Sequence, residues 1–193
     1  TYTVEEKDEF AGIQFSIATA SYTIQSNLSG SFNCTNLAAA VALGRYCDVP
    51  APAIVQALTD YLPAMNRVEW RKTASNQVLL DAYNANPTSM SLSIENFAKW
   101  HKDGWLVLGD MFELGEESAA EHRAIVKLVQ RINMEERCIL VGKHFGRTSW
   151  RGKQFPTTGD LKTYWKENGA PKDAAILLKG SRGIALEQLL PLL

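Results

Sequence analysis

Three short apolar runs in the second half of the chain constrain its fold more than any other feature. They are "WLVLG" (105–109), "CILVG" (138–142) and "AILLKG" (175–180), and each contains a closing glycine that precedes a helical pattern. Strands that are apolar without alternation are buried on both faces, as in a parallel sheet covered by helices on each side. The sequence therefore predicts an α/β fold with a Rossmann-like, doubly wound, mostly parallel sheet.

The elements around these runs follow a regular strand and helix alternation. Strands are expected at 68–72, 77–83, 104–110, 138–142 and 174–180, and helices at 88–100, 118–132, 160–168 and 181–193. Thr88 or Ser89 is expected to cap the first helix, and Ser118 with Glu121 has the spacing of a capping box for the second. Ligands of such sheets bind beyond the carboxyl ends of the strands.

The first 66 residues have a different pattern. Alternating residues predict strands at 12–19 and 22–30, and helices are expected at 35–47 and 49–62, the latter with Pro52 in its first turn. Two strands and two helices of this length expose much apolar surface. We therefore interpret residues 1–66 as a small appendage or as the tail of a larger domain, and residues 67–193 as a complete second domain.

Composition excludes several classes of protein. Among 193 residues, 46% are hydrophobic, and 20 basic residues balance 21 acidic ones, so no strong field favours nucleic acid or an anionic membrane. Cys34, Cys47 and Cys138 are odd in number and lack C-x-x-C spacing, which is typical of a reducing compartment. No apolar run approaches the length of a membrane span, and no signal peptide is evident. We expect a soluble cytosolic protein without membrane insertion.

Polar segments follow four of the predicted strands: "DAYNANPTSM" (81–90), "GDMFELG" (109–115), "VGKHFG" (141–146) and "KGSRG" (179–183). For one such segment, ordinary turn and cap residues are the simpler explanation. Four such polar segments at the same edge of one sheet favour a binding site. Lys179 and Arg182, with the backbone N–H groups beside them, suit a carboxylate or phosphate, although a solvated lysine beside a helix cap is the alternative.

Several kinds of catalytic site are not supported. The chain has no G-x-x-x-x-G-K-[ST] phosphate loop, no G-x-G-x-x-G and no G-x-S-x-G. His101, His122 and His144 lack metal-ligand spacing, and we expect His101 on a surface turn, His144 near the rim and His122 near the site or solvated, each in an ordinary structural role. We expect no metal ligands in this chain and no ATP turnover by this chain alone.

Together, "DAYNANPTSM", "VLGDMFELGEES" followed by His122, and "LLKGSRG" resemble the C-terminal domain of the Mur ligases. Upstream, "GSFNCTNLAAAVALG" is similar to the segment near the end of the family's central ATPase domain, and "LPAMNRVEW" to the junction that carries its arginine. Phe32 stands where the family has histidine, and Asn66 where glycine is common. The Y-N-A-N-P and G-D-M-x-E-L-G blocks resemble the family member whose substrates are UDP-N-acetylmuramoyl-tripeptide and D-alanyl-D-alanine.

The resemblance implies an ATP-dependent peptide ligase of peptidoglycan synthesis, cytoplasmic and monomeric, that uses ATP and Mg²⁺. The phosphate loop and the metal ligands belong to family segments upstream of this stretch, so the resemblance places no metal ligand and no catalytic residue here. Two alternatives remain open: a different Mur-type or folylpolyglutamate-type ligase, and a non-catalytic Rossmann-like binding module.

The resemblance also implies site residues. Asn33 and Asn36 would face adenine, Arg67 the ATP phosphates, and Asp81 the ribose hydroxyls. The cleft for the dipeptide would be lined by Asn84, Asn86, Ser89, Asp110 and Glu113. The carboxylate of the dipeptide would be held by Lys179, Ser181 and Arg182.

Overall fold

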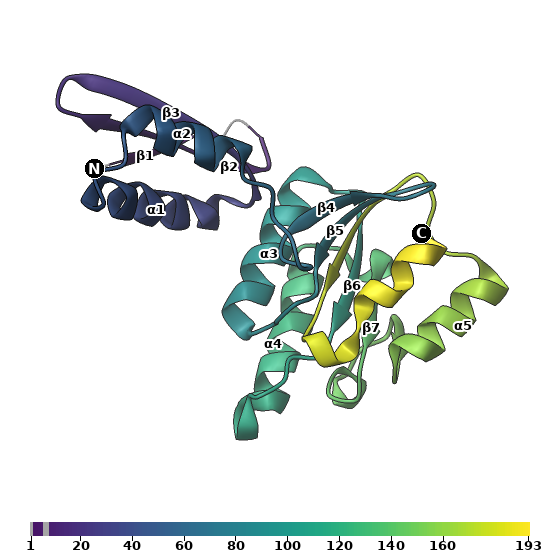
Figure 1. Cartoon of the computed structure of the whole chain (residues 1–193). Coiled ribbons are helices and arrows are strands. Elements are labelled where there is room, and N and C mark those ends of the chain that lie inside the picture. The colour runs from purple at the N-terminus through teal and green to yellow at the C-terminus, as the bar shows by residue number, and fades with distance from the viewer. Residues whose placement is uncertain (1, 6–7) are drawn as a thin grey trace. The chain divides into compact units, whose positions relative to one another are not determined.

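The computed structural model describes residues 2–5 and 8–193, and the chain separates into two compact units, residues 1–64 and residues 65–193. The first unit has an antiparallel sheet of β1 (Tyr2–Glu5), β2 (Phe10–Ile17) and β3 (Ala20–Ser29), in that order (Figure 1). Both β2 and β3 were predicted as strands. Strand β1 was not, because four residues are too few to establish a periodicity.

Two helices complete the first unit. A 3₁₀ turn, η1 (Ser31–Asn33), leads into α1 (Cys34–Tyr46), and α2 (Ala51–Asp60) has Pro52 in its first turn as predicted. Helix α2 packs against β3, and α1 packs against β2. The core between them consists of Ala11, Ile13, Phe15, Ile24, Cys34, Leu37, Val41 and Ile54.

The second unit is built on a six-stranded sheet. Its strands are β4 (Glu69–Lys72), β5 (Gln77–Asp81), β6 (Trp105–Gly109), β7 (Cys138–Val141), β8 (Lys153–Phe155) and β9 (Ala175–Lys179). The order is β4-β5-β9-β6-β7-β8, and all neighbours are parallel except β4 with β5. This arrangement confirms the predicted mostly parallel α/β fold. The edge strand β8 was not predicted, since three residues with two exposed carry little apolar signal.

Helices cover both faces of this sheet (Figure 1). Helices α3 (Pro87–Trp100) and α4 (Ser118–Arg131) pack on one face, where Leu79, Leu108 and Leu177 point. Helix α5 (Thr158–Asn168) and the C-terminal segment pack on the other face, where Leu80 and Leu178 point. Because side chains alternate along a strand, burial on both faces makes each strand continuously apolar.

The strand connections change direction within the sheet, which gives it a topological switch point. Strands β5 and β6 continue into α3 and α4 on one face. Strand β9 lies between them and continues toward the opposite face, into the 3₁₀ turns η5 (Arg182–Ile184) and η6 (Leu186–Leu192). Chains that diverge in this way leave a crevice at the carboxyl ends of the strands, which is where ligands of open α/β sheets bind.

The predicted closing helix at 181–193 is wrong. The structure has η5 and η6 there, separated by Ala185 in the left-handed conformation with φ of 58°. Pro191 also lies inside η6 and has no N–H to continue a helix. Two further 3₁₀ turns, η3 (Glu135–Arg137) and η4 (Phe145–Arg147), flank β7.

The predicted helix caps are also wrong. Asn86 caps α3: its side chain accepts a hydrogen bond from the Ser89 N–H, and the Ser89 hydroxyl accepts one from the Asn86 N–H. Helix α4 has no capping box of Ser118 and Glu121, because the 3₁₀ turn η2 (Gly115–Glu117) runs directly into it and Ser118 is its first residue.

Candidate functional site

The carboxyl ends of β5, β9, β6 and β7 form one edge of the second unit, and the segments that follow them are hydrogen-bonded to one another. The Ser181 N–H donates to the Asp110 carbonyl oxygen (3.0 Å), and the Phe112 N–H donates to the Ser181 hydroxyl (2.9 Å). A Cβ atom on Gly180 would lie 2.8 Å from Gly109 Cα, so a glycine is needed for this approach. The four polar strand ends therefore meet, as the sequence predicted.

Asp81 and Lys179 form a buried ion pair at this edge. Asp81 Oδ2 accepts hydrogen bonds from Lys179 Nζ and, at 3.3 Å, from the Ser93 hydroxyl. Lys179 is only 1% exposed, so the alternative of a solvated lysine is wrong. A buried charge is stable only when it is paired and hydrogen-bonded, and here each residue provides this for the other. No described residue donates to the second oxygen of Asp81, Oδ1.

Asp110 holds the segment after β7. Its two oxygens accept from the backbone N–H groups of His144 (2.8 Å) and Phe145 (2.9 Å), and the side chain is almost fully buried. Gly142 has φ of 129°, and a Cβ there would lie 2.2 Å from the Asp110 carboxyl carbon. Asp110 thus links the ends of β6 and β7.

His122 fixes the segment after β6 from the side of α4. Its Nδ1 lies 2.6 Å from the Ser118 carbonyl oxygen and must donate to it, so Nε2 is the nitrogen that accepts from the Met111 N–H (3.1 Å). The ring is fully buried, and this burial is the main reason why the pKa of His122 lies below its ordinary value. The expectation of a solvated His122 is therefore wrong.

His144 stacks on His122 with ring centroids 5.3 Å apart, and its Nδ1 lies 3.1 Å from the Ser118 hydroxyl. It is partly exposed and lines a pocket of about 230 Å³ with the residues Gly115, Glu116, Ser118, Ala119, Arg147 and Thr148. The sequence did not reveal this cluster. Its only signal was the spacing of Ser118 and His122, which places both on one face of a helix.

Tyr83 brings two arginines together. The Arg67 guanidinium carbon lies 3.8 Å from the centroid of its ring, and that of Arg182 lies 5.6 Å away. Arg67 comes from the segment before β4 and Arg182 from the segment after β9. The sequence predicted both arginines but gave Tyr83 no role.

The other residues predicted to contact the dipeptide differ in whether their polar side-chain groups are free to bind it. Asn86 Oδ1 and the Ser89 hydroxyl cap α3. Asn84 and Glu113 are exposed, and Glu113 is in the left-handed conformation with φ of 63°. Asn86 is exposed as well, and its Nδ2 takes no part in the cap, so Asn84, Asn86 and Glu113 all present polar groups to solvent.

The residues predicted to face adenine lie in the first unit and are bonded to each other. Asn36 Nδ2 donates to Asn33 Oδ1 (2.9 Å), and Asn33 Nδ2 donates to the Ser29 carbonyl oxygen (2.8 Å). Asn33 is buried and Asn36 is exposed. Asn33 thus orients the amide of Asn36.

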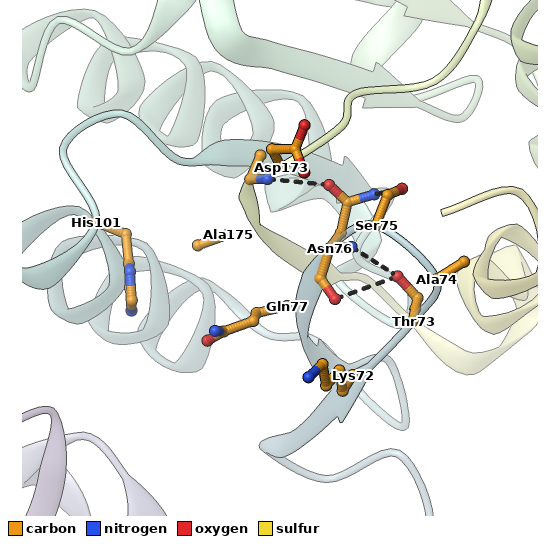
Figure 2. A pocket seen from close by; sticks show the side chains of 10 residues that line it. Lys72, Thr73, Ala74, Ser75, Asn76, Gln77, His101, Asp173 and Ala175 are labelled. Atoms are coloured by element: carbon orange, nitrogen blue, oxygen red, sulfur yellow. Dashed lines mark hydrogen bonds between the residues drawn. The ribbon is translucent and has the colours of Figure 1, made fainter.

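A larger pocket of about 520 Å³ lies at the opposite edge of the sheet, near the amino ends of β5 and β9 (Figure 2). It includes none of the predicted site residues. At its wall, Asn76 donates to the Pro171 and Leu193 carbonyl oxygens and accepts from the Ala174 N–H. All polar atoms of the Asn76 side chain therefore have protein partners, which indicates a structural role.

Within residues 2–5 and 8–193, no cluster of His, Cys, Asp and Glu suits a metal ion, and no helix is long and apolar enough to cross a membrane. The three cysteines are free.

Comparison with known proteins identifies the family. Residues 66–182, more than half of the chain, match the family described as "Mur ligase, glutamate ligase domain". The chain belongs to the Mur ligase family. The matched region contains all four strand ends of the carboxyl edge, and Asn33 and Asn36 of the first unit lie outside it.

Individual Mur ligases are similar over nearly the whole chain. The UDP-N-acetylmuramoyl-tripeptide--D-alanyl-D-alanine ligase of Escherichia coli is 33% identical over 92% of this chain. A crystal structure of MurF from Acinetobacter baumannii covers 97% of this chain with a TM-score of 0.81 and 26% identity. The MurF ligase of Thermotoga maritima in complex with ADP, 18% identical, has the same fold with a TM-score of 0.76 over 99% of this chain. This chain spans 40%, 43% and 45% of their respective lengths.

Proposed function

We propose that this chain forms part of an ATP-dependent ligase that adds D-alanyl-D-alanine to UDP-N-acetylmuramoyl-tripeptide in peptidoglycan precursor synthesis. The observation that carries the proposal is the carboxyl-edge site, in which the blocks around Asn84 and Glu113 meet the segment of Ser181 and Arg182. Similarity to relatives of that name supports it. The whole enzyme is proposed to be a cytosolic monomer.

In such a reaction, ATP transfers its terminal phosphoryl group to the terminal carboxylate of the tripeptide, and ADP leaves. The amine of the dipeptide then attacks the acyl phosphate and loses a proton, and inorganic phosphate leaves as the amide bond forms. The exposed carboxylate of Glu113 suits the ammonium end of the dipeptide, Asn84 suits its peptide group, and Arg182 suits its carboxylate. Holding the amine close to the acyl phosphate raises the rate because it replaces a bimolecular encounter with a bound geometry.

Asp110 and Lys179 are buried, and in this proposal they position the site without contacting the substrates. Both oxygens of Asp110 accept backbone hydrogen bonds, and Lys179 is paired with Asp81. Their role is to hold the strand ends in place, as the cap of Asn86 and Ser89 does for the start of α3.

Nucleotide contacts are proposed separately for each unit. The exposed amide of Asn36, oriented by Asn33, suits the adenine edge, Arg67 suits the phosphates, and Asp81 Oδ1 suits a ribose hydroxyl. The ADP complex of the Thermotoga maritima ligase supports nucleotide binding by the family. ATP supplies the phosphoryl group. The described residues form no group of three or more His, Cys, Asp or Glu that could hold a metal ion.

Residues 1–66 are proposed to belong to the central ATP-binding domain and residues 67–193 to form the C-terminal domain. Because the sequence contains no phosphate loop, the 193-residue chain is expected not to turn over ATP. Release of ADP by the pure chain would contradict this expectation.

Calorimetric titration of the chain with D-alanyl-D-alanine tests the proposal, with L-alanyl-L-alanine as the control. We expect saturable binding of the D,D form alone. If the chain shows none, the titration is repeated with the full-length ligase and ATP. Equal affinity for both dipeptides there, or binding of neither, would overturn the proposed substrate.

A further inference from the structure

Tyr83 is the feature of the carboxyl edge that neither the fold nor the proposed substrate explains. It follows β5, it is partly exposed, and two guanidinium groups lie against its ring. The arginines come from segments more than 100 residues apart in the sequence, one before β4 and one after β9. A single aromatic ring thus gathers two cations from different strand connections.

Neither Arg67 nor Arg182 has an ion-pair partner in the part of the chain that the structure describes. Because both guanidinium carbons lie near the same ring, they are within about 10 Å of each other. This separation is close to the Debye length at physiological salt, so salt does not fully screen the repulsion between the two charges. The negative face of the ring offsets part of this repulsion.

The backbone around Tyr83 supports this arrangement. The Ala82 N–H donates to the Asn66 carbonyl oxygen (2.9 Å), which ties the residue before Tyr83 to the residue before Arg67. One residue further back in β5, Asp81 is paired with Lys179, which lies three residues before Arg182. The two residues before Tyr83 are therefore bonded to the segments that carry Arg67 and Arg182.

We propose that Tyr83 is a positioning residue whose ring holds Arg67 and Arg182 as a pair that binds one phosphate-bearing group. A guanidinium presents a planar fork of donors that matches phosphate oxygens, and two such forks beside each other suit a group with more than one negative charge. This inference rests on the proposed function but reassigns Arg182 from the dipeptide carboxylate to the phosphate-bearing group. In that reaction the group is either the nucleotide phosphate chain or the acyl phosphate.

The test is calorimetric titration of the 193-residue chain at low ionic strength with two probes, inorganic pyrophosphate and acetyl phosphate. We expect Tyr83→Leu to weaken binding of the preferred probe about tenfold, and Tyr83→Phe, which keeps the ring, to remain within about twofold of the original chain. A preference for pyrophosphate assigns the nucleotide phosphates, and a preference for acetyl phosphate assigns the acyl phosphate.

Two further sets of variants separate positioning from folding. Arg67→Lys and Arg182→Lys leave the ring in place and keep the charge but lose the planar fork, so each is expected to weaken binding. Arg137→Gln is the matched control, because Arg137 precedes β7 at the opposite edge of the sheet and should not affect the probes. The melting temperature of each variant verifies that it is folded.

Equal affinity of Tyr83→Leu and the original chain would overturn the inference, as would failure of both probes to bind the original chain. Neither probe contains an alanyl group. The outcome is therefore independent of the dipeptide titration, and the failure of one proposal is distinguishable from the failure of the other.

Discussion

His122 Nε2 lies 3.1 Å from the backbone nitrogen of Met111 and accepts its hydrogen bond. The histidine is inside α4 and the methionine is in the segment after β6, so this bond fixes the G-D-M-F-E-L-G segment to a helix. It exists only while Nε2 carries no proton, because Nδ1 already donates to the Ser118 carbonyl oxygen.

The free energy of unfolding should therefore fall as the pH falls below about 6.5, the ordinary pKa of histidine in an unfolded chain. Burial lowers the pKa of His122 and nearby His144 adds to this, whereas the Ser118 carbonyl, Asp110 and Glu121 oppose it. Between the lowered folded pKa and the unfolded pKa, the unfolded state binds more protons, and stability decreases with decreasing pH. Urea unfolding at several pH values should show a flatter profile for His122→Gln than for the original chain.

Replacing Asp110 by Asn should destabilise the second unit by about 2 to 4 kcal/mol, since a donor NH₂ group would then face one of two buried backbone N–H groups. Amide exchange of His144 and Phe145 should accelerate. Asp103→Asn is the matched control, because that side chain is 93% exposed and its substitution should have little effect. Similar unfolding midpoints for the two variants would contradict the anchoring role of Asp110.

Gly142→Ala should cost about 3 kcal/mol, from the strain of a positive φ and from the overlap of its methyl group with the Asp110 carboxylate. Gly146→Ala offers a control four residues away, because a Cβ there meets no atom within 4 Å. The difference between the two in thermal unfolding measures the combined cost of the positive φ and of the overlap with Asp110. If both alanines were tolerated equally, the geometry of this turn would be wrong.

Breaking the buried ion pair should cost more than removing it. Lys179→Met leaves the Asp81 carboxylate without its cation and is expected to destabilise the unit by about 3 to 5 kcal/mol. The double variant Asp81→Leu with Lys179→Met removes both charges and should recover much of this loss. Equilibrium unfolding of the single and double variants measures the coupling, and strict additivity would show that the pair makes no net contribution.

The central strands were predictable because short, continuously apolar runs between helices are typical of strands buried on both faces. Such runs located β5, β6, β7 and β9, and the rule for carboxyl ends then located the site. The strands without that signal, β1 and β8, are three or four residues long and lie at sheet edges. For them, pairing with a neighbouring strand decides the conformation, and pairing is not visible in a local sequence pattern.

The side-chain partners could not be predicted for a related reason. Local spacing suggested that Ser118 would cap α4 and that Lys179 would hold an anion or, alternatively, be solvated. Tertiary contacts instead engage Ser118 with two histidines and Lys179 with a carboxylate 98 residues away. Left-handed residues such as Ala185 also end helices without any glycine or proline at that position to signal it.

The role proposed for Glu113 in binding the dipeptide can be measured directly. Its left-handed backbone exposes the carboxylate, and in the proposed reaction that carboxylate binds the ammonium group of the incoming dipeptide. Glu113→Gln keeps the size of the side chain but removes the charge, so D-alanyl-D-alanine should bind about tenfold more weakly, which corresponds to about 1.4 kcal/mol. Glu116→Gln removes an exposed charge three residues away and should leave the affinity unchanged. Because both side chains are exposed, neither variant should alter the unfolding midpoint, and calorimetric titration of the full-length ligase reports the affinity alone. A loss of affinity equal in both variants would indicate a general effect of negative charge rather than a contact made by Glu113.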